Sequence, residues 1–135
     1  MKLLSLRPRA ERGNEMREIA PHQLARMKPH PLIIDIREER EYLLGHIECA
    51  VHVSRNVLES KVLEIAPELD TQIVIYCAVG SACVSATEAL RRLGYQKILS
   101  LKGGLQSWLE AGGLVESSQS GAKLREFTPS ARYRS

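Results

Sequence analysis

The chain has 135 residues, of which 44% are hydrophobic and 26% charged, a composition typical of one soluble globular domain. Its net charge of +3 comes from the two ends, because residues 1–15 and 115–135 each carry four basic and two acidic side chains. The near-neutral centre and the 4% of aromatic residues argue against a specific nucleic-acid surface. No apolar run is long enough to span a membrane, and three cysteines without framework spacing favour a reducing, cytoplasmic setting.

The ends of the chain differ in pattern from its centre. We expect a mobile N-terminal extension over residues 1–15, a domain over 16–114 and a flexible basic tail over 115–135, because both ends lack a hydrophobic period. Between them, short apolar runs alternate with helical patterns, which is typical of a parallel sheet covered on both faces. In chain order the sequence predicts a helix at 21–27, a strand at 32–36, a helix at 38–44, a strand at 50–53, a helix at 56–66, a strand at 73–76, a helix from about 81 to 93, a strand at 98–101 and a helix at 105–111.

Cys77 is the strongest candidate for a catalytic residue. It directly follows the expected strand at 73–76, and sites in open parallel sheets form at the carboxyl ends of strands. The loop that follows is short and contains Gly80, so its amides and the start of the next helix would favour an anion. A cysteine held in such a place has its pKa lowered from about 8.5 to about 3.5–7.5. The pattern therefore favours a nucleophilic thiolate over a buried structural cysteine.

Three ordered motifs resemble those of rhodanese-like domains, and together they cover about residues 17–113. They are Leu32-Ile33-Ile34-Asp35-Ile36-Arg37-Glu38 with Glu41-Tyr42, Gly45-His46-Ile47 and Ala50; Cys77-Ala78-Val79-Gly80; and Gly103-Gly104-Leu105 with Trp108 and Gly112. The resemblance implies an α/β fold with a central parallel sheet of about five strands and helices on both faces. It also implies a sulfurtransferase whose Cys77 thiolate takes a sulfane sulfur from a small donor or a persulfidated protein and passes it to a thiol acceptor. We expect no cofactor, and the histidines show no metal-ligand spacing.

The expected active-site loop departs from the family pattern. We expect the backbone amides of Ala78, Val79, Gly80, Ser81 and Ala82 to bind the substrate. Family members usually have an arginine where Ala82 stands and a serine where Cys83 stands. That arginine faces the incoming anion, and a hydrogen bond to a charged group is worth about 1.5–3 kcal/mol. We therefore expect thiosulfate to be a poor donor.

Cys83 leaves two interpretations open. On the first turn of the expected helix its pKa would be lowered, and it would accept sulfur from Cys77 or form a disulfide with it. The plainer interpretation is a small buried side chain in place of serine; in either case we expect no stable bridge in the resting protein. Asp35 and Arg37, which end an earlier strand, are candidates for a supporting ion pair. Cys49 is expected to be packed in the interior.

Two other functions stay open beside the sulfurtransferase. One is a non-enzymatic rhodanese-like module that carries a persulfide between partners or binds proteins through the basic ends of the chain. The other is a dithiol redox protein that uses Cys77 and Cys83. The absence of an arginine at position 82 is the feature that separates the first interpretation from these two.

Overall fold

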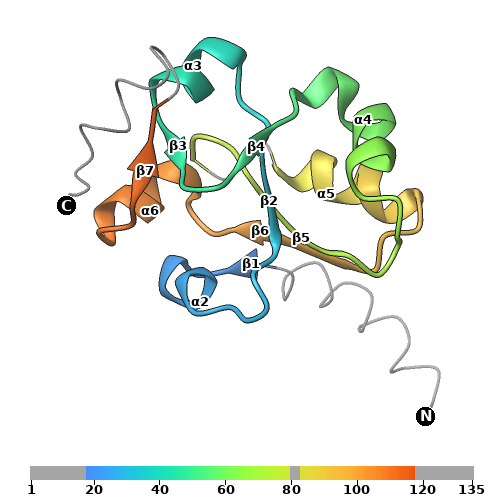
Figure 1. Ribbon diagram of the computed structural model, residues 1–135, viewed down its shortest axis with the longest axis horizontal. Coiled ribbons are helices and arrows are strands. Elements are labelled where there is room, and N and C mark those ends of the chain that lie inside the picture. The colour runs from blue at the N-terminus through green and yellow to red at the C-terminus, as the bar shows by residue number, and fades with distance from the viewer. Residues whose placement is uncertain (1–17, 80–82, 118–135) are drawn as a thin grey trace.

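A computed structural model describes residues 18–79 and 83–117, which form an α/β fold. The central sheet has five parallel strands in the order β1-β6-β5-β2-β4 (Figure 1). These strands are β1 (Glu18–Ile19), β2 (Leu32–Asp35), β4 (Val51–His52), β5 (Gln72–Tyr76) and β6 (Lys97–Leu101). The expected fold class is confirmed.

Helices cover both faces of this sheet, as the alternation of patterns predicts. They are α2 (Pro21–Ala25), α3 (Glu39–Leu44), the 3-10 helix η1 (Arg55–Val57), α4 (Leu58–Ile65), α5 (Cys83–Arg92) and α6 (Gly104–Glu110). Side chains of α4 and α5 enter one hydrophobic cluster and those of α2 and α6 enter another, and Figure 1 shows the two pairs on opposite sides of the strands. The parallel strands are therefore buried on both faces.

The middle strand, β5, supplies both clusters and leads directly to the candidate catalytic cysteine. Ile73, Ile75 and Cys77 pack with α4 and α5, whereas Val74 and Tyr76 pack on the opposite side. This is the alternation that a pleated strand imposes. Cys77 continues the series that points toward α4 and α5, so its side chain belongs to the wall of that core.

The sequence pattern does not predict three very short strands. β1 supplies the fifth strand of the main sheet, and β3 (His46–Ile47) pairs antiparallel with β7 (Val115–Glu116). β7 lies beyond residue 114, where we expected the domain to end. Its pairing with β3 holds this part of the chain against the domain. The expected extension at 1–15 and the expected tail from 118 onward lie outside the described residues. No helix in the described part of the chain is long and apolar enough to cross a membrane.

Candidate active site

Cys77 lies at the carboxyl edge of the sheet, one residue beyond the end of β5. The amide of Ile36, just after β2, donates a hydrogen bond of 3.1 Å to the carbonyl oxygen of Tyr76, so the two strand ends stay joined at this edge. Cys77 itself is 7% exposed, whereas the next two residues, Ala78 and Val79, are exposed. The other expected loop residues, Gly80, Ser81 and Ala82, lie outside the described residues.

The start of α6 holds the backbone of the candidate nucleophile. The amide of Leu105 donates to the carbonyl of Cys77 at 2.9 Å, and the amide of Gln106 donates to that of Ala78 at 3.1 Å. Gly104 makes this approach possible: its φ is +63°, and a Cβ there would lie 2.5 Å from the carbonyl oxygen of Cys77. Sequence reasoning missed this role, although two adjacent glycines before a helix were the available signal.

Cys83, the first residue of α5, touches Cys77 directly. Its Sγ donates a hydrogen bond to the Sγ of Cys77 at 3.5 Å and lies 3.8 Å from the carbonyl oxygen of Ile75. The side chain is 1% exposed. Its hydrogen bond to Cys77 and its burial both raise the pKa of the Cys83 thiol. The expectation of a lowered pKa is therefore wrong, because those two effects outweigh the helix terminus. All three cysteines of the chain are thiols in this structure.

A pocket of about 260 Å³ opens beside Cys77. It is lined by Ile36, Arg37, Glu38, Glu41, Arg55, Cys77, Ala78 and Val79. Two arginines and two glutamates thus face the same space, and their formal charges cancel. The pocket has room for a small molecule but offers little net attraction to an anion.

Arg37 lines this pocket and forms an ion pair with Asp35. The Asp35 carboxylate is fully buried and accepts hydrogen bonds from the Arg37 guanidinium at 2.8–3.1 Å. Arg37 also donates to the carbonyl of Gly45. Burial alone would lower the pKa of Arg37, but the adjacent Asp35 carboxylate raises it, so the arginine is charged. The structure joins the two predicted supporting residues as an ion pair, of which only Arg37 reaches the pocket.

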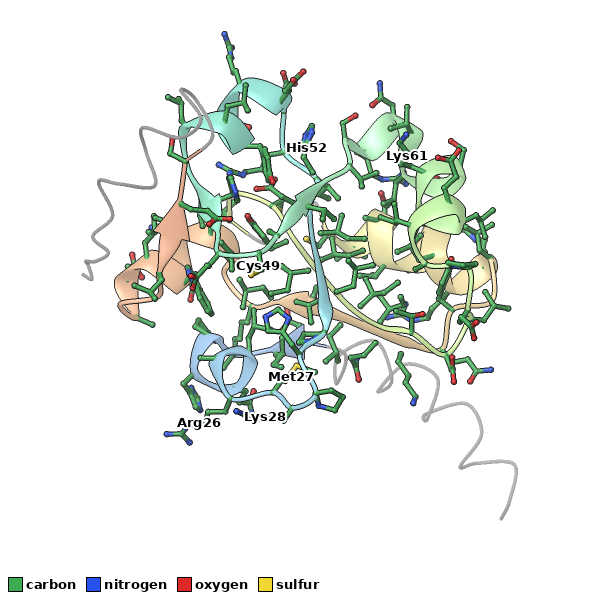
Figure 2. The ribbon with its side chains drawn as sticks, in the orientation of Figure 1. Arg26, Met27, Lys28, Cys49, His52 and Lys61 are labelled. Atoms are coloured by element: carbon green, nitrogen blue, oxygen red, sulfur yellow. The ribbon has the colours of Figure 1, made fainter. Side chains whose placement is uncertain are left out.

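Cys49 differs from its expectation. It is exposed on the turn between β3 and β4, with a left-handed φ of 72° (Figure 2). The expectation that it is packed is wrong, because this tight turn carries its side chain to the surface. Partial burial and the carboxylates of Glu48 and Glu116 raise the pKa of its thiol, so Cys49 is not activated. No cluster of three or more metal-binding side chains occurs within residues 18–79 and 83–117.

Comparisons with known proteins agree on one family. The family model described as rhodanese-like domain matches residues 20–111. A protein named thiosulfate sulfurtransferase GlpE, from Ectopseudomonas mendocina, is 27% identical over 96 residues, which is 70% of this chain and 86% of that protein. The solution structure of the rhodanese-like domain from the Anabaena protein Alr3790 has a TM-score of 0.69 at 26% identity, covering 78% of this chain and 83% of that one. A rhodanese-related protein from Thermoplasma volcanium has a TM-score of 0.65 at 31% identity, covering 73% and 96%. The chain therefore belongs to the family of rhodanese-like domains.

Proposed function

We propose that this protein is a sulfurtransferase that carries a sulfane sulfur as a persulfide on Cys77. The observation that carries the proposal is the placement of Cys77 at the carboxyl end of the central strand, beside a pocket and with the S–H of Cys83 directed at its sulfur. A hydrogen bond donated to a sulfur favours its thiolate, which is the nucleophilic form. The similarity to a protein named thiosulfate sulfurtransferase agrees with this chemistry.

The proposed reaction has two displacements at sulfur. The Cys77 thiolate attacks the outer sulfur of a donor; the new S–S bond forms as the donor's own S–S bond breaks, and the donor leaves as a thiolate or, from thiosulfate, as sulfite. A thiol acceptor then attacks the outer sulfur of the Cys77 persulfide. This second step transfers the sulfur and returns Cys77 to its thiolate.

The charges around Cys77 offer little attraction to a small, compact dianion. Arg55 is paired with Glu59 at 3.1 Å, and Glu38 and Glu41 line the pocket, so a dianion such as thiosulfate gains little there. Position 82, where an arginine would face the anion, carries alanine. We therefore propose small organic persulfides or persulfidated proteins as donors and thiosulfate as a poor one.

Sulfur loading followed by intact mass spectrometry tests the proposal. Treated with glutathione persulfide, freed of excess donor and measured at once, wild-type protein should carry one added sulfur that a reductant removes, and peptide mapping should place it on Cys77. Cys49→Ser, a matched exchange at the exposed thiol, should load equally, whereas Cys77→Ser should not load. Equal loading of Cys77→Ser would show that the assigned nucleophile is wrong.

A further inference from the structure

Cys83 donates a hydrogen bond to Cys77 but forms and breaks no covalent bond in the two displacements above, yet its sulfur is positioned to react. The two sulfurs are 3.5 Å apart, at the outer limit of the distances at which bound groups react, about 3–3.5 Å. A covalent S–S bond of about 2.05 Å needs a further approach of roughly 1.5 Å. Because Cys83 is almost fully buried, reagents in solution cannot reach its sulfur. The sulfur of Cys77, in contrast, is in direct contact with it.

The surroundings of the pair decide which sulfur Cys83 would attack. Cys83 lies on the core side of Cys77, in contact with the carbonyl of Ile75, and is not among the residues that line the pocket. Cys77 contacts Cys83 and also lines the pocket, which is the space open to an added sulfur. With the added sulfur in the pocket, Cys83 would approach the inner sulfur from the core, away from the leaving atom, as displacement at sulfur requires.

We infer that Cys83 is a resolving thiol that releases the sulfur carried by Cys77 as hydrogen sulfide; this inference rests on the proposed persulfide. The Cys83 sulfur attacks the Sγ of Cys77, a Cys77–Cys83 disulfide forms, and the bond from Cys77 to the outer sulfur breaks. The outer sulfur leaves with that electron pair as hydrosulfide and takes the proton of Cys83. The sulfane sulfur is thereby reduced while the two cysteines are oxidised, and no outside oxidant is needed. A dithiol reductant then restores both thiols.

The proton on Cys83 couples this release to loading. In the unloaded protein the neighbouring Cys77 sulfur and burial hold the proton on Cys83, which keeps it unreactive. Once Cys77 carries a sulfur, the negative charge moves to the outer atom, so that burial alone still favours the protonated form of Cys83, and the proton passes to the departing sulfur in the step itself. The thiol is thus inactive until there is a sulfur to release.

The test follows the fate of one loaded sulfur without added thiol. Wild type, Cys49→Ser and Cys83→Ser are loaded with glutathione persulfide, separated from excess donor and followed by sulfide detection and intact mass. Wild type and Cys49→Ser should release one sulfide per loaded chain and lose two hydrogens as the disulfide forms. Cys83→Ser, which keeps a hydroxyl donor toward Cys77, should retain the added sulfur, with release slower by at least about tenfold.

The outcomes separate this inference from the proposed function. If wild type and Cys83→Ser both load and retain their sulfur equally, the resolving role is overturned while the Cys77 persulfide stands. If the sulfur of wild type moves to Cys83 as a persulfide, Cys83 is a second carrier and the inference is also overturned. If neither protein gains sulfur, the proposed function fails and the inference fails with it. Cys83→Ala serves in the same test if Cys83→Ser does not fold, which circular dichroism determines.

Discussion

Glu38 lies on the wall of the Cys77 pocket, where its negative charge opposes an anionic donor. Glu38→Gln should raise kcat/KM for thiosulfate by about two- to fivefold, because removing one screened charge is worth about 0.5–1 kcal/mol. Steady-state rates at several salt concentrations measure this, and the gain should shrink as salt rises. Glu39→Gln is the matched control, since Glu39 lines a neighbouring pocket but not that of Cys77. An equal gain in both variants would assign the effect to the general field of the protein.

The raised pKa of Cys83 makes stability depend on pH at the alkaline end. The folded protein keeps the Cys83 proton above pH about 8.5, where the unfolded chain loses it, so stability is fully present below that pH and falls as pH rises. The free energy of unfolding should drop by up to about 1.4 kcal/mol per pH unit more in wild type than in Cys83→Ser. Urea unfolding under reducing conditions between pH 8 and 10 measures the two slopes. If the free energy of unfolding falls with pH equally in wild type and Cys83→Ser, the pKa of Cys83 is not raised in the folded protein.

Sequence reasoning correctly placed Cys77 at the end of a strand but misjudged the pKa of its neighbour Cys83. An apolar β-branched run followed by a cysteine, a glycine and a helical pattern predicts a strand–loop–helix site without any knowledge of packing. The contact of Cys83 with Cys77 depends on the path of the intervening loop, which has no period to read. The direction of its pKa depends on burial, which a position on a first helical turn does not reveal.

At the level of elements, the N-terminal end of α6 sets the position of the backbone of Cys77, the proposed nucleophile. A Cβ on Gly104 would lie 2.5–2.8 Å from backbone atoms of Cys77 and Ala78, so Gly104→Ala should push the two segments apart. We expect a loss of stability of about 2 kcal/mol or more and at least about tenfold slower sulfur loading. Thermal unfolding and loading followed by mass spectrometry measure the two effects.

Gly112→Ala is the matched control for that substitution. Gly112 also has a positive φ, of 84°, but a Cβ there meets nothing within 4 Å. This variant should suffer the backbone strain alone, about 1 kcal/mol, and keep the wild-type rate of loading. If the two alanine variants load sulfur at the same rate, the contact between α6 and Cys77 does not position the nucleophile.

The longer elements and the two-residue strand β4 followed from the sequence, whereas β1, β3 and β7 did not. The apolar run at 73–76 differs from β5 by one residue, and the helix expected at 56–66 corresponds to η1 and α4 in succession. β1, β3 and β7 have two residues each, too few for an alternating pattern to emerge. These strands exist because partners elsewhere in the fold pair with them, and such long-range pairing cannot be read from local sequence.

At the scale of the whole molecule, β5 couples the two core layers. Ile75 packs with α4 and α5, whereas Trp108, the only tryptophan, packs in the opposite layer. Ile75→Ala should cost about 2–5 kcal/mol and shift the Trp108 fluorescence transition together with that of far-UV circular dichroism. Leu63→Ala, at an exposed position of α4, should shift both far less. A fluorescence midpoint unmoved by Ile75→Ala would mean that the layers unfold separately.

If Cys77 carries sulfur and Cys83 releases it as proposed, the contact between the two residues gives every loaded sulfur two fates and therefore a limited lifetime. Transfer to an acceptor requires a collision and accelerates with acceptor concentration, whereas release by Cys83 occurs within one chain at a constant rate. Half of the loaded sulfur reaches an acceptor when the acceptor concentration equals the first-order rate constant of release divided by the second-order rate constant of transfer. Above that concentration the protein would act mainly as a sulfur donor, and below it as a source of sulfide. The concentration of acceptor would thus determine which product forms.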